Sequence, residues 1–153
     1  KSTVGRILSK KIKLNFLDID KLIEQKMDLS ISEIFKRKGE DFFREIEEKT
    51  TVKYLKSSNN IIALGGGAFL NNNIRAALKA NSISIWLNWS SKLLIPRISK
   101  NKTRPKASEL SKNELVELIN ERSKIYSMAD YEINCDKLNK NEIVKKILKI
   151  YEN

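Results

Sequence analysis

The sequence contains no histidine and a single cysteine, Cys135. Without histidine there is no imidazole to act as a general base or bind a metal, and one cysteine excludes an internal disulfide and a zinc site built from several cysteines. No apolar run approaches the roughly 20 residues of a membrane-spanning helix. The basic first residues also lack the apolar stretch of a signal peptide. These absences predict no membrane partner.

The composition is that of one globular domain. The chain has 153 residues, of which 41% are hydrophobic, enough for a soluble domain with its own core. It shows no internal repeat and no domain boundary, so we expect a single domain over residues 1–153. We expect Cys135 to be a small buried residue at the end of a strand.

Basic residues outnumber acidic ones by 30 to 19, which gives a net charge of +11. Nucleic-acid-binding proteins gather basic residues on one face and interleave aromatic ones. Here the basic clusters fall in separate segments, at residues 10–11, 36–38, 100–102 and 145–146. We therefore interpret the charge as solvated surface and predict no nucleic-acid partner, although a positive field would help to gather anionic ligands.

Apolar residues recur at helical spacing along much of the chain, and short apolar runs separate these segments. The pattern predicts helices at residues 2–11, from about 21, 30 and 39 up to 55, and at 72–80, 90–98, 113–127 and 141–151. It predicts strands at residues 15–18, 61–64, 83–87 and 131–135. Strands separated by helices favour an α/β fold with a parallel sheet and right-handed crossovers. The polar stretch at residues 99–111 is expected to be a loop.

The chain opens with Lys1-Ser2-Thr3 followed by a predicted helix, as at the end of the phosphate-binding loop G-x-x-x-x-G-K-[ST]. In such a loop the backbone N–H groups cradle phosphates, the lysine reaches the β- and γ-phosphates, and the hydroxyl binds Mg²⁺. The loop glycines are not in the sequence. Taken alone, the tripeptide favours an ordinary helix in a lysine-rich chain.

Further motifs follow in a fixed order. They are Asp18-Ile19-Asp20, Gly39-Glu40-Asp41-Phe42-Phe43-Arg44, Gly65-Gly66-Gly67, Arg104-Pro105 and Arg122-Ser123-Lys124-Ile125-Tyr126. This combination resembles shikimate kinase over essentially the whole chain. The resemblance implies a P-loop kinase-like parallel sheet of five strands flanked by helices, a substrate-binding segment at about residues 19–47 and a lid at about residues 97–110.

In the family pattern the central strand of the sheet precedes the phosphate-binding loop. That strand would lie before Lys1 and is not in the sequence. A sheet without its central strand exposes backbone donors and acceptors and apolar side chains. We therefore expect the 153 residues alone to be poorly stable and inactive, and a polypeptide extended upstream to fold.

The resemblance assigns ATP as co-substrate and Mg²⁺ as cofactor. It implies that Lys1, Ser2 and Thr3 bind the nucleotide, with Lys1 on its β- and γ-phosphates and Ser2 on the metal. In the lid, Arg97 would stack on adenine and Arg104 would neutralise charge on the transferred phosphoryl group. Closure of such a lid expels water and completes the site.

Asp18 and Asp20 stand at the end of the first predicted strand. Residues at i and i+2 of a strand point to the same side, about 7 Å apart, so one could serve a metal and the other an acceptor hydroxyl. By resemblance, Asp18 would hold Mg²⁺ through a water molecule and Asp20 would orient or deprotonate the substrate hydroxyl. The alternative is a strand-to-helix junction with Asp20 as the N-cap.

Arg44 and Arg122 are the candidates for a substrate carboxylate, because a guanidinium group can bind a carboxylate through two parallel hydrogen bonds. The resemblance gives both arginines this role, whereas each alone would be a surface ion pair. Gly65, Gly66 and Gly67 follow a buried strand and let the backbone approach a ligand. In the family this run contacts shikimate, whereas a plain turn would need one glycine.

The sequence departs from the family pattern in the lid and in the last motif. Lys106 and Ala107 follow Arg104-Pro105 where the family usually has two leucines, which removes an apolar anchor. Lys124 stands where the late helix often has proline. These departures concern lid closure and turnover and leave the substrate contacts intact.

We therefore predict an ATP-dependent shikimate kinase that makes shikimate 3-phosphate and ADP on the route to chorismate and aromatic amino acids. The alternative is a non-catalytic shikimate-kinase-like binding or regulatory protein, and a more distant one is a kinase for another polyol acid such as gluconate. We expect a monomer in the cytoplasm, or in an organelle if a transit peptide lies upstream.

Overall fold

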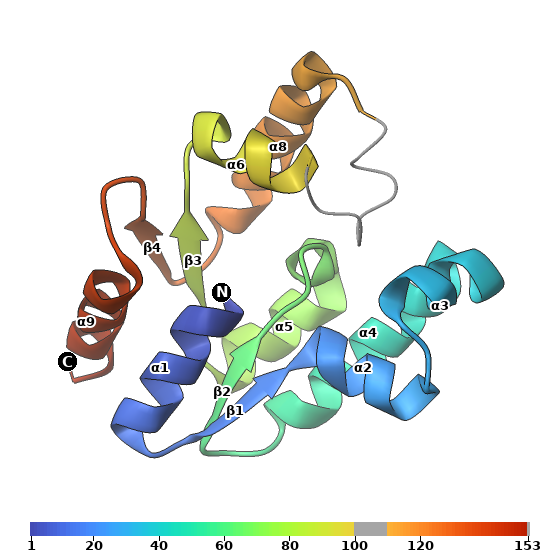
Figure 1. The fold of residues 1–153 in the computed structure, drawn as a ribbon. Helices are drawn as coiled ribbons and strands as arrows, with labels where there is room; N and C mark the ends of the chain where they lie inside the picture. Colours follow the sequence, from blue (N-terminus) through green and yellow to red (C-terminus); the bar gives the residue numbers. More distant parts are fainter. Residues whose placement is uncertain (100–109, 153) are drawn as a thin grey trace.

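The computed structural model describes residues 1–99 and 110–152 (Figure 1). Its elements are α1 (Ser2–Ile12), β1 (Asn15–Asp18), α2 (Ile19–Met27), α3 (Ile31–Lys38), α4 (Glu40–Leu55), β2 (Asn60–Ala63), the 3₁₀ turn η1 (Ala68–Leu70), α5 (Asn72–Asn81), β3 (Ile85–Asn88), α6 (Ser91–Ser99), α8 (Lys112–Tyr126), β4 (Tyr131–Asn134) and α9 (Lys140–Tyr151). Each helix and strand predicted from periodicity is present, with its ends shifted by no more than two residues.

Among the described helices, three begin with a capping box. The pairs are Ser30 with Glu33 at α3, Ser111 with Glu114 at α8, and Asn139 with Glu142 at α9. In each pair the side chain of the N-cap residue accepts a hydrogen bond from the third helical N–H, and the glutamate accepts one in return from the N-cap N–H. Local sequence therefore fixes where these helices start.

The strands of the described residues form two parallel pairs. β1 pairs with β2 in the register Asp18 to Ala63, and β3 pairs with β4 in the register Asn88 to Asn134. Helices α2, α3 and α4 group beside the first pair, and α6 and α8 lie together beyond the carboxyl end of β3 (Figure 1). The predicted α/β class with parallel strands is confirmed.

A cavity of about 560 Å³ lies between the two strand pairs. Residues of β2 and β3 line it from opposite sides, and α1, α5, α8 and α9 contribute further apolar side chains. Within residues 1–99 and 110–152, no strand pairs with the second edge of β2 or of β3. The two pairs therefore meet across this cavity and not through backbone hydrogen bonds.

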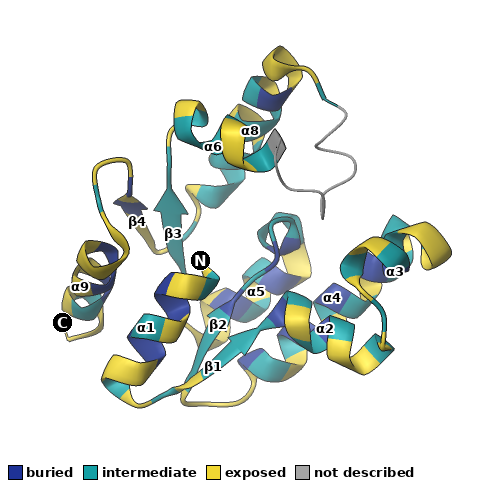
Figure 2. Cartoon of the chain, in the orientation of Figure 1, coloured by how far each residue is buried: buried dark blue, intermediate teal, exposed yellow. Residues whose placement is uncertain are grey.

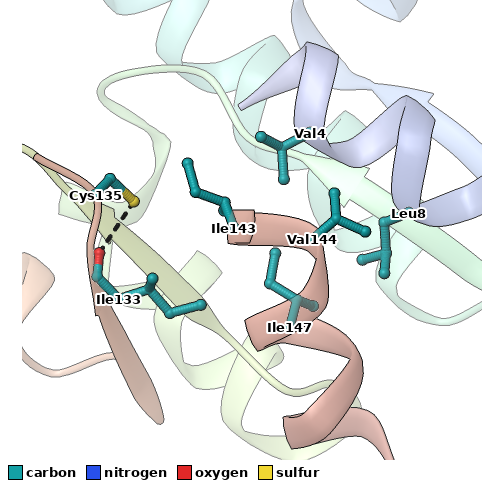
Figure 3. Packing of buried hydrophobic residues seen from close by; sticks show 7 residues of the cluster. All are labelled: Val4, Leu8, Ile133, Cys135, Ile143, Val144 and Ile147. Carbon is teal, nitrogen blue, oxygen red and sulfur yellow. Dashed lines mark hydrogen bonds between the residues drawn. The ribbon is translucent and has the colours of Figure 1, made fainter. Parts of the chain in front are cut away.

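The largest buried cluster joins the first and last helices. Its members are Val4, Leu8, Ile133, Cys135, Ile143, Val144 and Ile147, from α1, from α9 and from β4 and the residue after it (Figure 3). Both helices combine buried and exposed residues, as amphipathic helices do (Figure 2). Cys135 is 1% exposed and directly follows β4, as expected.

Two smaller clusters support the other side of the molecule. Ile19, Ile23, Ile34 and Phe43 pack α2, α3 and α4 together, and a third cluster lies between α4, η1 and α5. Ile19 is completely buried directly after β1, which fixes the point where the strand turns into α2. None of the described helices has the length and apolar character needed to cross a bilayer.

Candidate active site

The candidate site lies where the carboxyl ends of β1 and β2 meet the start of α1. Asp18 ends β1, and the hydroxyl of Ser2, in the first turn of α1, donates a hydrogen bond of 2.6 Å to its Oδ2. A hydroxyl and a carboxylate, both predicted to hold a metal, are therefore adjacent. Thr3 is exposed on the same turn of α1.

Asp20 lies in the first turn of α2 and not on the strand, so the prediction of two acids spaced along a strand was wrong. The chain turns into a helix at Ile19, because the burial of that side chain among α2, α3 and α4 outweighs continuation of β1. The N-cap alternative for Asp20 was also wrong, since Asp18 occupies that position. An acid in a first helical turn is favoured by the helix dipole.

Lys1 and Asp20 face each other across the mouth of the site. Lys1 Nζ lies 4.0 Å from Asp20 Oδ2, and their side chains are 39% and 36% exposed. An ion pair this open contributes little stability. The pair instead serves to position groups, because it places the ammonium group of Lys1 next to the carboxylate of Asp20, which was predicted to orient the acceptor hydroxyl.

Arg44 projects from α4 and is held by two acids of the same helix. It donates hydrogen bonds of 2.6 Å to Glu47 and 3.2 Å to Glu40. Partial burial acts to lower the pKa of Arg44, but the bonds and charges of Glu47 and Glu40 outweigh it and raise that pKa. Arg44 therefore stays protonated and fixed in direction.

Glu47 is the most deeply buried charged group of the site, with 2% of it exposed. Burial raises its pKa above the ordinary value, and the neighbouring Arg44 opposes that rise. Its Oε1 is buried and has no hydrogen-bond partner in the part of the chain that the structure describes. A side chain at Gly65 would collide with this oxygen and would lie 2.7 Å from Asp20 Oδ1. Glycine at position 65 therefore leaves room for two carboxylates to approach the backbone.

The other two glycines of the run contact different elements. A Cβ at Gly67 would lie 2.5 Å from Arg44 Nη1, so this guanidinium packs directly against the backbone. The carbonyl of Gly66 accepts a hydrogen bond from the hydroxyl of Tyr126, on α8. Arg122, one turn earlier on α8, lines the same cavity as Gly65 and Gly66. The glycine run is therefore a meeting point of α2, α4 and α8.

The predicted nucleotide side is described only in part. Arg97, near the end of α6, places its guanidinium carbon 5.7 Å from the centre of the Trp89 ring, and both residues line the cavity together with Lys1. Arg104, Lys106 and Ala107 lie outside the described residues, as does most of the predicted lid at 97–110.

Two residues of this site had no role assigned from the sequence. Glu47 stands three residues after Arg44, a spacing that puts both on one face of a helix and could have indicated an ion pair. Nothing in the sequence indicates that Glu47 is buried, because this depends on the packing of α4 against other elements. The bond between Tyr126 and Gly66 joins residues 60 positions apart and has no local signal.

Comparison with known proteins gives matches over nearly the whole of this chain. The chain matches the family model of shikimate kinase over residues 1–152. It is 36% identical over 148 residues to a shikimate kinase of Sulfurihydrogenibium sp. (strain YO3AOP1), covering 97% of this chain and 89% of that protein. It is 34% identical to the shikimate kinase of Caldanaerobacter subterraneus subsp. tengcongensis, covering 99% of this chain and 89% of that protein.

Solved structures agree with these matches. Shikimate kinase from Aquifex aeolicus vf5 superposes with a TM-score of 0.89 at 32% identity, covering 99% of this chain and 89% of that one. Shikimate kinase from Acinetobacter baumannii, solved in complex with shikimate, superposes with a TM-score of 0.90 at 29% identity, covering 98% and 85%. Sequence, fold and relatives lead to the same conclusion: this chain belongs to the shikimate kinase family.

Proposed function

We propose that this chain transfers the γ-phosphate of ATP to the 3-hydroxyl of shikimate, giving shikimate 3-phosphate and ADP for chorismate and aromatic amino acid biosynthesis. Membership of the family confirms the predicted enzyme class, an ATP-dependent kinase that acts on a hydroxyl of shikimate. The observation that supports the residue roles best is the convergence of a lysine, a hydroxyl–carboxylate pair, a second carboxylate and a glycine run at one edge of β1 and β2.

Phosphoryl transfer depends mainly on positioning and on neutralising charge. Lys1 binds the β- and γ-phosphates at the start of α1, where free backbone N–H groups also favour an anion. Its ammonium group already lies near the carboxylate of Asp20, so the phosphate and the acceptor are brought to the same place.

Ser2 and Asp18 are the residues that hold Mg²⁺. Their oxygens are hard ligands and lie together in the structure, 2.6 Å apart. Among the described residues there is no cluster of three or more acidic, histidine or cysteine side chains. This fits Mg²⁺, which binds to one or two protein oxygens and completes its shell with phosphate oxygens and water. When bound, the ion neutralises charge on the phosphates.

Asp20 orients the 3-hydroxyl of shikimate and accepts its proton as the oxygen attacks the γ-phosphorus and ADP departs. The position of Asp20 in the first turn of α2 supports this role, because its carboxylate faces both Lys1 and the glycine run. General base catalysis of this kind contributes about 10²- to 10⁴-fold to a rate.

Arg44 and Arg122 bind the carboxylate of shikimate from α4 and α8. Arg44 is held in place by Glu47 and Glu40, and Nε of Arg122 is buried without a hydrogen-bond partner in the described part of the chain. A buried donor without a partner is unfavourable, and a carboxylate oxygen would satisfy it. The glycine run, residues 65–67, supplies backbone next to the substrate.

Arg97 stacks on the adenine of ATP. Its exposed guanidinium group now lies over Trp89 at the edge of the cavity, a weak contact that a nucleotide base can replace. Thr3 completes the nucleotide contacts, and Arg104 neutralises charge on the transferred phosphoryl group. The monomeric state and the cytoplasmic location stay predictions.

The test is release of ADP by the complete polypeptide with ATP and Mg²⁺, with and without shikimate. We expect turnover that requires shikimate and does not occur with gluconate, which lacks the cyclic framework that the glycine run would contact. A folded protein that binds ATP but releases no ADP with shikimate would contradict the proposal and favour the non-catalytic alternative.

A further inference from the structure

Tyr126 is fixed at both ends of its side chain. Its ring centre lies 6.2 Å from that of Phe69 and 6.0 Å from that of Trp86, so α8 is packed against η1 and β3 at this point. Its hydroxyl donates a hydrogen bond to the carbonyl of Gly66. Tyr126 is partly buried, and a tyrosine in such a position commonly pairs its hydroxyl, but here the partner is the middle residue of the glycine run.

The glycine run needs such a restraint, because glycine has more backbone freedom than any other residue. The carbonyl of Gly65 accepts a hydrogen bond from the N–H of Ala68, and that of Gly67 accepts one from the N–H of Leu70. The turn that follows therefore holds the first and third carbonyls. The second carbonyl, that of Gly66, is held by Tyr126.

The direction of this carbonyl sets the direction of the next N–H. A peptide unit is planar and trans, so its C=O and N–H point to opposite sides. When Tyr126 holds the carbonyl of Gly66, it also fixes the N–H of Gly67 on the opposite side of the peptide. That donor lies in the run against which Arg44 packs.

Tyr126 also links α8 to the glycine run. Arg122 is four residues earlier on the same helix, and residues with this spacing lie on one face. Arg122, Tyr126 and Gly66 all line the cavity. A hydrogen bond from α8 to Gly66 therefore also positions the guanidinium group of Arg122 against the run.

We propose that Tyr126 is a positioning residue for substrate binding, which holds the glycine run and Arg122 in the arrangement that receives the acidic substrate. The proposal rests on the proposed function, because it gives Gly66, Gly67 and Arg122 their substrate. The hydroxyl acts through these groups and touches no reacting atom.

The test compares Tyr126→Phe with the unaltered complete polypeptide. Phenylalanine keeps the ring contacts with Phe69 and Trp86 and removes only the hydroxyl. The net contribution of one hydrogen bond corresponds to about a two- to tenfold change in an equilibrium constant. We expect the KM for shikimate to rise by about this factor, with the KM for ATP unchanged and Tm lowered only slightly. Tyr131→Phe, on β4 with an exposed ring, is the matched control and should change neither KM.

A KM for shikimate within twofold of the unaltered value would overturn the proposal, as would an equal rise in both KM values together with a large loss of Tm. Shikimate binding measured by calorimetry distinguishes failure of the positioning role of Tyr126 from failure of the proposed function. If the unaltered protein binds shikimate without turnover, weaker binding by Tyr126→Phe supports the positioning role and equal binding overturns it. If the unaltered protein does not bind shikimate, both proposals fail.

Discussion

The carboxylate of Glu47 belongs to an almost completely buried residue, of which 2% is exposed. Arg44 donates a hydrogen bond to one of its oxygens, and the other is without a partner among the described residues. Burial of a partly satisfied charge is unfavourable and raises the pKa of Glu47. The same carboxylate fixes the direction of Arg44, so stability is reduced at a point where the proposed function needs a fixed guanidinium group.

This burial predicts a pH dependence. Because the pKa of Glu47 is raised above its ordinary value of 4.5, the folded chain binds more protons than the unfolded chain just above that pH. The free energy of unfolding therefore falls as pH rises through the raised pKa. Glu47→Gln removes this contribution. Urea titrations between about pH 4 and pH 8 should therefore show a smaller fall in the free energy of unfolding for the variant than for the unaltered chain.

The control for this prediction is Glu45→Gln on the same helix. Glu45 is 61% exposed and pairs with Lys49 at the surface, so its loss should change the free energy of unfolding only slightly. Equal pH slopes for the unaltered chain and Glu47→Gln would show that Glu47 does not titrate as its burial implies.

At the scale of elements, Asp130 ties the starts of β3 and β4 together. Its carboxylate accepts hydrogen bonds from the backbone N–H and the hydroxyl of Ser84, at 2.7 and 2.6 Å. These bonds lower the pKa of Asp130 below its ordinary value of 3.8. The contribution to stability is therefore present above about pH 3.8 and is lost as pH falls through the lowered pKa.

Asp130→Asn should destabilise the chain by less than about 1 kcal/mol at neutral pH, because a neutral amide accepts these hydrogen bonds less strongly than a carboxylate, and because solvent screens this exposed group. The difference in the free energy of unfolding between the variant and the unaltered chain should become smaller in acid, because Asp130 of the unaltered chain becomes protonated. Thermal unfolding at pH 7 and near pH 3 measures both values. Glu121→Gln, exposed on α8, is the control, and a loss of stability of the same size at both pH values would contradict the account.

At the scale of the whole molecule, the cavity between β2 and β3 bears on stability. Each strand pairs on one side within the described residues, and the space of about 560 Å³ between them is lined largely by apolar side chains. Unpaired strand edges and exposed apolar surface both reduce stability. We therefore expect an additional extended segment to pair with both edges and join the two halves of the sheet.

A polypeptide in which an apolar strand and a glycine loop lead into Lys1 should unfold cooperatively and at a higher temperature than the 153 residues alone. Calorimetry measures the unfolding temperature of both chains and of a third chain in which a polar flexible segment replaces the strand. The third chain shows whether stabilisation comes from strand pairing or from the added length alone. Cooperative unfolding of the 153 residues at the same temperature as the extended chain would contradict this expectation.

Features of the fold and the site that depend on residues close together in the sequence could be predicted. Features that depend on packing between distant elements could not. Helices and parallel strands follow from apolar periodicity, and the short motifs place Lys1, Asp18 and Arg44 near a common site. The position of Asp20 on a helix could not be predicted, because the burial of Ile19 decides it. The depth of Glu47 and its approach to Gly65 likewise depend on packing between separate elements.

The central claim is that Asp20 orients and deprotonates the acceptor hydroxyl of shikimate. The most direct measurement is kcat for shikimate-dependent ADP release by the unaltered polypeptide, by Asp20→Asn and by Asp28→Asn, which changes an exposed aspartate at the other end of α2. The account predicts a fall in kcat of about 100-fold or more for Asp20→Asn and none for Asp28→Asn. A kcat for Asp20→Asn within a few-fold of the unaltered value would contradict it.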